Sequence, residues 1–311
     1  MTILVTGGGG FLGSHVVDRL RAAGKDPFVA ARSEHDLVDP SASRRLFDAT
    51  RPEVVFHLAA EVGGIGANRA APGRFWYANL AMGMNVLEEC RRLEVRKLVL
   101  VGTVCAYPKL TPVPFSETDL WSGYPDETNA PYGIAKRTLL TGAWAYREQY
   151  GLNVIYVIPA NLYGPRDNFD TATSHVIPAI IRKTVDARQS GTSRVLLWGD
   201  GSPTREFLYV EDCAEALVRA ASDYEGAEPV NLGTGEEISI RDLALLIADV
   251  TGFEGKFVWD PEQPGGQPRR RLDVDRAAER LDFRARTPLR EGLERTVAWY
   301  LAHRSSPLVA G

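Results

Sequence analysis

A glycine-rich turn near the start of the chain is the feature that most constrains its fold. Thr6–Gly13 follows the short apolar run Ile3–Val5, and helical periodicity extends over residues 11–23. A strand that passes through such a turn into a helix brings backbone N–H groups to the helix N-terminus, where a pyrophosphate can bind. The spacing differs from the common Rossmann spacing and is set by three glycines: Gly7, Gly10 and Gly13.

The first half of the chain alternates apolar runs with helical segments. Strand-like runs lie at residues 3–6, 27–31, 54–59, 97–102 and 153–159, and helical patterns lie around residues 11–23, 40–49, 76–93 and 131–150. This alternation predicts an α/β fold with a doubly wound parallel (Rossmann) sheet. Ligands of such sheets bind beyond the carboxyl ends of the strands, so we expect the site there.

Beyond about Pro165 the sequence becomes richer in loops and short elements. We expect residues 1–165 to form a dinucleotide-binding domain and residues 166–311 to form mainly a smaller substrate-binding lobe. Val230–Gly233 is interpreted as a strand that returns to the large sheet, so segments within about 205–235 are assigned to the first domain. The two lobes should therefore interleave in the sequence.

Composition excludes several classes of function. A net charge of -4 argues against non-specific nucleic-acid binding, which depends on cationic neutralisation of phosphates. The 3 cysteines are too few and too scattered for a disulfide framework or a metal cluster, so we expect no metal and a reducing, cytoplasmic location. No apolar run approaches the roughly 20 residues that span a bilayer, so we expect no membrane partner.

Tyr132 and Lys136 form the most informative catalytic pattern. Four residues apart on a predicted helix, they lie on one face, one turn apart. We expect the ammonium to favour the phenolate and bring a phenol pKa of about 10 nearer neutrality. Such a pair often arises by chance, but downstream of the glycine turn it indicates hydride chemistry on a nicotinamide, with Tyr132 as acid or base.

The glycine spacing matches the turn of extended short-chain dehydrogenases, and within that superfamily the chain resembles the GDP-L-fucose synthase family almost end to end. Members of that family epimerise GDP-4-keto-6-deoxy-mannose at C-3 and C-5 and then reduce C-4 with NADPH. The stretches that carry the resemblance are Glu61–Asn68, Cys105–Pro108, Thr128–Tyr132, Asn161–Pro165, Asp167–Asp170, Ser174–Ala179, Arg205–Val210 and Pro264–Arg269.

The resemblance implies catalytic roles. Tyr132 would donate a proton to the alkoxide that develops at C-4, and Lys136 would hold the cofactor ribose and tune the phenol. Thr103 stands where the family usually has serine; it keeps the hydroxyl that would bond the carbonyl, while its methyl group narrows the pocket. Cys105 and His175 match the family's epimerisation pair, a base and an acid on opposite faces of the sugar ring.

Taken alone, Cys105 is more often a buried small hydrophobe and His175 a structural histidine. Their joint match to the family positions favours catalysis. We expect a neighbouring histidine, or the surroundings of the cofactor, to favour the thiolate.

Two departures from the family leave the function open. Val104 replaces a usual second serine and Lys183 replaces a common arginine. A nucleotide-sugar 4-ketoreductase of a deoxysugar pathway, without epimerisation, is the nearest alternative. A non-catalytic NADP(H)-binding sensor is an alternative of another class, which the intact set of Thr103, Tyr132 and Lys136 disfavours.

The end of the second predicted strand favours NADPH over NADH. It has no acidic residue at its tip for a ribose 2′-hydroxyl, whereas Arg32 can meet a 2′-phosphate. Glu34 lies nearby and keeps NADH open. Asp36 and Leu37 are expected to flank the adenine. The other residues expected to contact the cofactor are Gly7, Gly10, Phe11, Leu12, Gly13, Leu58, Ala59, Ala60, Tyr132, Lys136, Leu162 and His175.

The expected partner is a nucleotide-diphosphate sugar. Arg205 and the run Arg269–Arg271 supply bidentate donors for a diphosphate, and within that run we select Arg269. Lys183 matches a substrate-binding position of the family, and Asn161 and Trp198 match positions near the nucleotide sugar, although Trp198 alone also suits a core position. By resemblance, helices around 76–93 and 131–150 should pair across the two-fold axis of a homodimer.

Overall fold

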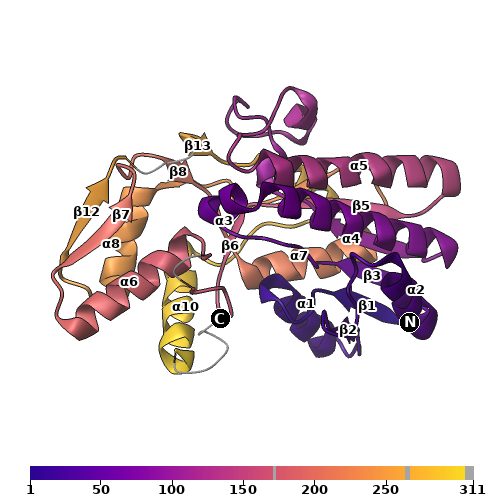
Figure 1. Ribbon diagram of the computed structural model, residues 1–311, viewed down its shortest axis with the longest axis horizontal. Helices are drawn as coiled ribbons and strands as arrows, with labels where there is room; N and C mark the ends of the chain where they lie inside the picture. The colour runs from indigo at the N-terminus through magenta and orange to yellow at the C-terminus, as the bar shows by residue number, and fades with distance from the viewer. Residues whose placement is uncertain (171–172, 263–266, 305–311) are drawn as a thin grey trace.

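The computed structural model describes residues 1–170, 173–262 and 267–304. Residues 264–266 of the family-matching stretch therefore lie outside the described residues. Figure 1 shows a larger lobe, built on a sheet flanked by helices, beside a smaller lobe that holds most of the C-terminal half of the chain.

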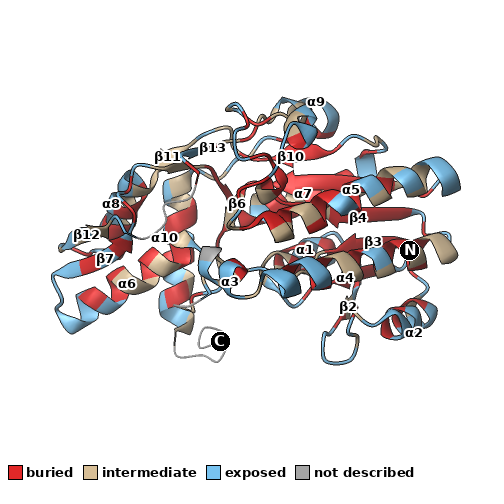
Figure 2. Cartoon of the chain, turned by 45° about the horizontal axis from the view of Figure 1, so that its top comes forward, coloured by how far each residue is buried: buried red, intermediate tan, exposed pale blue. Residues whose placement is uncertain are grey.

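The larger lobe contains a six-stranded parallel sheet with the strand order β10-β5-β4-β3-β1-β2. Figure 2 shows the central strands of this sheet buried among helices, as expected of a parallel sheet covered on both faces, whereas the edge strand β2 is partly exposed. The predicted doubly wound parallel sheet is confirmed. Its strands are β1 (Ile3–Thr6), β2 (Phe28–Ala30), β3 (Val54–His57), β4 (Lys97–Val101), β5 (Val154–Pro159) and β10 (Val230–Leu232).

Helices cover both faces of this sheet. On one side α4 packs against α2 and α5, and on the other α1 packs against α7 (Figure 1). Their bounds are α1 (Phe11–Ala22), α2 (Pro40–Thr50), α4 (Pro72–Arg92), α5 (Ala130–Tyr150) and α7 (Val210–Asp223). The helix expected around 76–93 begins earlier, because Pro72 occupies its first turn, where a missing N–H costs no hydrogen bond. No helix in the ranges that the structure describes is both long and apolar enough to cross a bilayer.

Short elements connect the sheet to the cavity described below. The 3₁₀ turn η1 (Val104–Ala106) follows β4, and η2 (Glu117–Trp121) lies in the loop before α5. A six-residue helix, α3 (Ile65–Ala70), precedes α4 and was not predicted from the sequence.

The smaller lobe has its own hydrophobic core, formed chiefly by three helices and a parallel strand pair. The helices are α6 (Val176–Ser190), α8 (Ile240–Thr251) and α10 (Leu289–His303), and the pair is β7 (Arg194–Trp198) with β12 (Lys256–Asp260). A small sheet beside them contains β8 (Thr204–Arg205), β11 (Ile238–Ser239) and β13 (Arg269–Arg270).

The chain passes between the two cores several times. Strand β6 (Asn161–Tyr163) pairs with β9 (Phe207–Tyr209), after which α7 and β10 join the first core. A later return was not predicted from the sequence: Leu272 and Phe283 belong to the first core, and α9 (Asp275–Leu281) packs against β10 and α7.

Gly133, on the first turn of α5, lets that helix approach the backbone of η1. A Cβ atom there would overlap the carbonyl oxygen of Cys105. We expect Gly133→Ala to lower the free energy of unfolding by about 1–3 kcal/mol, because the clash is with backbone that cannot move aside.

Urea denaturation monitored by circular dichroism measures this change. Gly73→Ala, on α4, is the matched control, because a Cβ atom there meets nothing within 4 Å. Equal losses of stability in the two variants would contradict the packing argument.

Candidate active site

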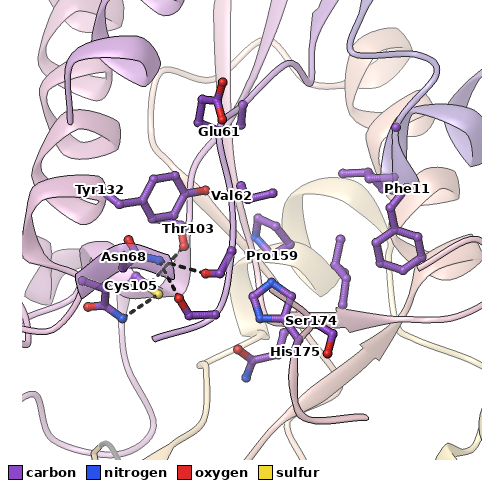
Figure 3. A pocket seen from close by; sticks show the side chains of 18 of the residues that line it. Phe11, Glu61, Val62, Asn68, Thr103, Cys105, Tyr132, Pro159, Ser174 and His175 are labelled. Carbon is purple, nitrogen blue, oxygen red and sulfur yellow. Dashed lines mark hydrogen bonds between the residues drawn. The ribbon is translucent and has the colours of Figure 1, made fainter. Parts of the chain in front are cut away.

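A cavity of about 850 Å³ is lined by residues of both lobes at the carboxyl ends of the central strands. Its size suits a small organic ligand. Figure 3 shows Thr103, Cys105 and Tyr132 together on one side of it and Ser174 and His175 on another. All but one of the predicted site residues line it: Gly7, Gly10, Phe11, Leu12, Gly13, Arg32, Asp36, Leu37, Leu58, Ala59, Ala60, Thr103, Cys105, Tyr132, Lys136, Asn161, Leu162, His175, Lys183, Trp198 and Arg205. The exception is Arg269.

The glycine turn forms one end of this cavity and fits a dinucleotide pyrophosphate. Gly7 has a φ of +71°, and a Cβ atom there would lie 2.5 Å from the backbone nitrogen of Ala59. The helix that follows is capped by Gly10, without a side-chain cap and without an acidic residue in its first turn. The first N–H groups of α1 therefore remain available to an anion at the helix N-terminus.

Arg32 lies at the rim of the same end of the cavity. Its side chain is 72% exposed and donates a 2.6 Å hydrogen bond to Glu61 Oε1, which also accepts from Arg74 at 3.1 Å. Because the Arg32 guanidinium is exposed, solvent screens its pair with Glu61, and a 2′-phosphate can compete with Glu61 for it.

Thr103, at the end of β4, faces Tyr132 and Lys136 on α5. The lysine Nζ lies 6.0 Å from the centre of the tyrosine ring, so the two side chains share a helix face as predicted. Burial raises the pKa of Tyr132 and the nearby Cys105 adds to this effect, while the hydrogen bond to Thr103 acts in the opposite direction. Burial lowers the pKa of Lys136 to about 8.

This result corrects the expectation that Lys136 brings the phenol nearer neutrality. In the structure the pKa of Tyr132 moves upward, because loss of solvation disfavours the phenolate. Tyr132 is therefore protonated at neutral pH, which suits a proton donor.

Cys105 contacts polar side chains that the sequence argument did not select. Its Sγ accepts a 3.2 Å hydrogen bond from Asn129 Nδ2 and lies 3.7 Å from Arg270 Nη1. His175 occupies the N-cap position of α6, on a different part of the cavity wall from Cys105 (Figure 3). Burial lowers the pKa of His175.

The two departures from the family both lie at the cavity. Val104 is buried in η1, immediately after Thr103, and contributes an apolar wall. Lys183 Nζ donates a 2.9 Å hydrogen bond to the carbonyl oxygen of Leu196, and burial lowers its pKa. Trp198 is 54% exposed, so it is not a core residue.

The arginine run divides between the surface and the cavity. Arg269 is exposed, is paired with Glu237 and does not line the cavity, whereas Arg270 lines it and is only 8% exposed. Neighbouring residues of a strand point to opposite faces, which explains the difference. Arg205 also lines the cavity, and burial followed by the charge of Arg270 lowers its pKa to about 10.

Asn129 and Arg270 are thus site residues that sequence reasoning missed. Asn129 lies within the family-matching stretch before Tyr132, and that position was the only available signal. Arg270 belongs to the noted basic run, but no periodicity indicates which of its arginines points inward.

The cavity and its Thr-Tyr-Lys set define a nicotinamide-dependent enzyme on a Rossmann sheet, and comparison with known proteins agrees. The model of the NAD dependent epimerase/dehydratase family matches residues 3–233. The chain is 41% identical over 301 residues to "Probable GDP-L-fucose synthase 1" of Oryza sativa subsp. japonica, covering 96% of this chain and 92% of the relative.

Solved structures give the same result. A GDP-L-fucose synthetase from Naegleria fowleri bound to NADP superimposes with a TM-score of 0.89 at 31% identity, covering 98% of this chain and 95% of that one. A GDP-6-OMe-4-keto-L-xylo-heptose reductase from C. jejuni superimposes with a TM-score of 0.91 at 27% identity, covering 97% of each chain. The resemblance inferred from the motifs is confirmed: the chain belongs to the GDP-L-fucose synthase family.

The buried ammonium of Lys136 generates a pH-dependent prediction. Between its folded pKa of about 8 and an unfolded pKa of about 10.4, the unfolded chain binds more protons, so stability rises with pH in this window. Below pH 8 the full penalty of burying the charge remains. We expect Lys136→Met to be more stable than wild type at pH 7 by on the order of 1–3 kcal/mol.

Urea unfolding of the two proteins between pH 7 and pH 10.5 measures the difference. The advantage of the variant should shrink as the pH rises above 8 and be small at pH 10.5, where the lysine is neutral in the folded state and only about half protonated in the unfolded chain. A variant less stable than wild type at pH 7 would show that favourable contacts outweigh the loss of solvation.

Proposed function

We propose that the protein converts GDP-4-keto-6-deoxy-mannose into GDP-L-fucose, by epimerisation at C-3 and C-5 followed by reduction of C-4 with NADPH. The observation that carries this proposal is one cavity lined by two sets of reactive side chains. Thr103, Tyr132 and Lys136 suit a ketone reduction, and Cys105 and His175 suit proton transfers at the carbons beside that ketone.

The reduction requires a proton donor at the ketone oxygen. NADPH, when bound, supplies the hydride to C-4. Tyr132 gives its phenolic proton to the developing alkoxide, and the Thr103 hydroxyl, which hydrogen-bonds the phenol, holds that proton donor in place. Lys136 Nζ lies 6.0 Å from the centre of the Tyr132 ring, and we assign it to the ribose of the bound cofactor.

The epimerisation requires a base and an acid on opposite faces of the sugar ring. The Cys105 thiolate removes a proton from a carbon next to the ketone, which leaves an enolate and a neutral thiol. His175, once protonated, returns a proton to that carbon from the other face and becomes neutral; its lowered pKa makes the protonated form a stronger acid. Exchange of protons with solvent restores both side chains, and the same cycle inverts the second carbon.

Two cationic side chains of the smaller lobe suit the diphosphate: Arg205 and Lys183 line the cavity on that side. Trp198 and Asn161 line it as well, and we assign them to the nucleotide sugar. In this proposal residues 1–165, with returning segments within about 205–235, form the NADP(H)-binding domain, and residues 166–311 mainly hold the substrate.

We further propose a homodimer in the cytoplasm. Trp76, Tyr77 and Met84 expose apolar surface on α4, and Tyr124 exposes its ring near α5. A small apolar hollow between these elements includes Trp76, Tyr124 and Ile134, which supports pairing through the two helices. The three cysteines are free thiols, the state that a reducing compartment maintains.

A 4-ketoreductase without epimerisation is the second candidate. Its support is the close structural likeness to the C. jejuni reductase, together with Val104, an apolar residue beside the catalytic threonine.

Incubation with GDP-4-keto-6-deoxy-mannose and NADPH in D₂O separates the two candidates. Epimerisation requires deuterium at C-3 and C-5 of the product, whereas reduction alone places none there. We expect Cys105→Ser to abolish deuterium incorporation while still reducing an already epimerised 4-keto sugar, since a serine hydroxyl is a far weaker base than a thiolate. If the product of the wild-type enzyme contained no deuterium at C-3 and C-5, the proposed epimerase activity would be wrong.

The assignment of Tyr132 as proton donor is tested by Tyr132→Phe. The ring still packs and only the hydroxyl is lost, so we expect turnover to fall about 10²- to 10⁴-fold with unchanged thermal stability. NADPH oxidation with the epimerised 4-keto substrate measures the rate. If this variant oxidised NADPH at nearly the wild-type rate, Tyr132 would not be the proton donor.

A further inference from the structure

We infer that Arg270 is a positioning residue for the epimerisation: its guanidinium stabilises the thiolate form of Cys105, and Asn129 orients the sulfur. This inference rests on the proposed function, in which Cys105 acts as a base. Arg270 Nη1 lies 3.7 Å from Sγ, and Asn129 Nδ2 lies 3.2 Å from it. A sulfur that faces two N–H donors is better solvated as an anion than as a thiol.

Arg270 is held by a neutral partner, which leaves its charge available. Its Nε and Nη2 donate to Gln267 Oε1 at 3.0 Å and 2.6 Å, and Gln267 Nε2 donates to the carbonyl oxygen of Lys109 at 2.8 Å. Gln267 is 4% exposed and Arg270 is 8% exposed. An amide rather than a carboxylate occupies two of its donors, and no carboxylate of the described residues forms an ion pair with Arg270. Its charge therefore acts on the sulfur from a poorly solvated place, where an electrostatic interaction is strong.

The other groups around Cys105 come from several elements. Arg205 on β8 is a second cation that acts on the sulfur, and Tyr132 on α5 is a neighbouring phenol. Thr103 accepts a hydrogen bond from the backbone nitrogen of Cys105 at 3.2 Å. The carboxylate of Asp126 interacts electrostatically with both Arg205 and Arg270, and its negative charge partly offsets the effect of their positive charges on the sulfur.

Arg270 is distinguished from these groups by direct contact. Among the described residues, its guanidinium is the cationic group with a hydrogen-bonding atom at Sγ. Its sequence neighbours face elsewhere: Arg269 pairs with Glu237 at the surface, and Arg271 Nη1 donates to the carbonyl oxygen of Gly235 at 3.4 Å.

The test is the pH dependence of Cys105 alkylation in the full chain. Iodoacetamide is added to wild type, Arg270→Gln, Arg270→Lys and Arg271→Gln between pH 6 and pH 10, and mass spectrometry of the Cys105 peptide gives the rate. At pH 7 we expect Arg270→Gln to react about tenfold or more slowly, since a cation beside a thiolate acts on this scale. The rates should converge at high pH, Arg270→Lys should retain most of the reactivity, and Arg271→Gln should match wild type.

A second variant keeps the test valid if Arg270→Gln does not fold. Gln267→Glu preserves the shape of the partner but neutralises Arg270 with a carboxylate, so it should slow alkylation at pH 7 in the same direction. Folding is checked by circular dichroism. The inference would be overturned if the alkylation profile of Arg270→Gln superimposed on that of wild type. If Arg270→Gln does not fold, the profile of Gln267→Glu decides in the same way.

Deuterium exchange separates failure of this inference from failure of the proposed function. If wild type incorporates no deuterium at C-3 or C-5, the epimerase proposal fails, while the alkylation profiles still decide whether Arg270 stabilises the thiolate. If wild type incorporates deuterium and Arg270→Gln does so at an equal rate, the role of Arg270 in epimerisation fails. We expect exchange to fall in parallel with alkylation and to recover in Arg270→Lys.

Discussion

The close approach of α5 to the segment after β4 is the contact on which the site depends. Gly133 has no side chain where the helix meets the backbone of Cys105, and Arg137 on the same helix donates from Nε to the carbonyl oxygen of Ala106 at 3.1 Å. Asn129, at the start of the helix, reaches the sulfur itself. This one junction therefore sets the relative positions of the phenol, the ammonium, the threonine hydroxyl and the thiol.

Burial at this junction determines the chemistry that its side chains can perform. It raises the pKa of Tyr132 and lowers the pKa of Lys136 to about 8, so both groups exchange protons at a different pH from the same groups in water. A buried ammonium also destabilises the folded chain. The buried charge at the site therefore lowers the stability of the folded chain but remains available to the ligands. Groups with shifted pKa values are common in active sites.

Local sequence patterns predicted the parts of the molecule that depend on local physics. The run Ile3–Val5 and the glycines after it are sufficient to indicate a buried strand, a turn and a helix N-terminus. The strand is buried in the core, and Gly7, Gly10 and Gly13 of the turn line the cavity. The helix α3 lacked such a signal, because six residues are too short to show periodicity.

Long-range features could not be obtained in the same way. The inward face of β13 depends on its pairing with β8, some 65 residues earlier in the chain, so the choice of Arg269 over Arg270 had no local basis. The pKa of Tyr132 depends on its burial in the folded chain, which cannot be deduced from its spacing to Lys136. The return of Leu272 and Phe283 to the first core likewise follows from tertiary packing.

The repeated crossing between lobes limits how such a protein can be recombined. An exchange of the chain at a single junction after β6 would replace α7, β10 and α9 together with the substrate-binding elements, although these three pack on the first core. The β10 strand of the grafted segment would then have to pair with the β5 strand of a sheet from another protein. New substrate specificity in this architecture is therefore more accessible through side chains at the cavity than through the shuffling of contiguous gene segments.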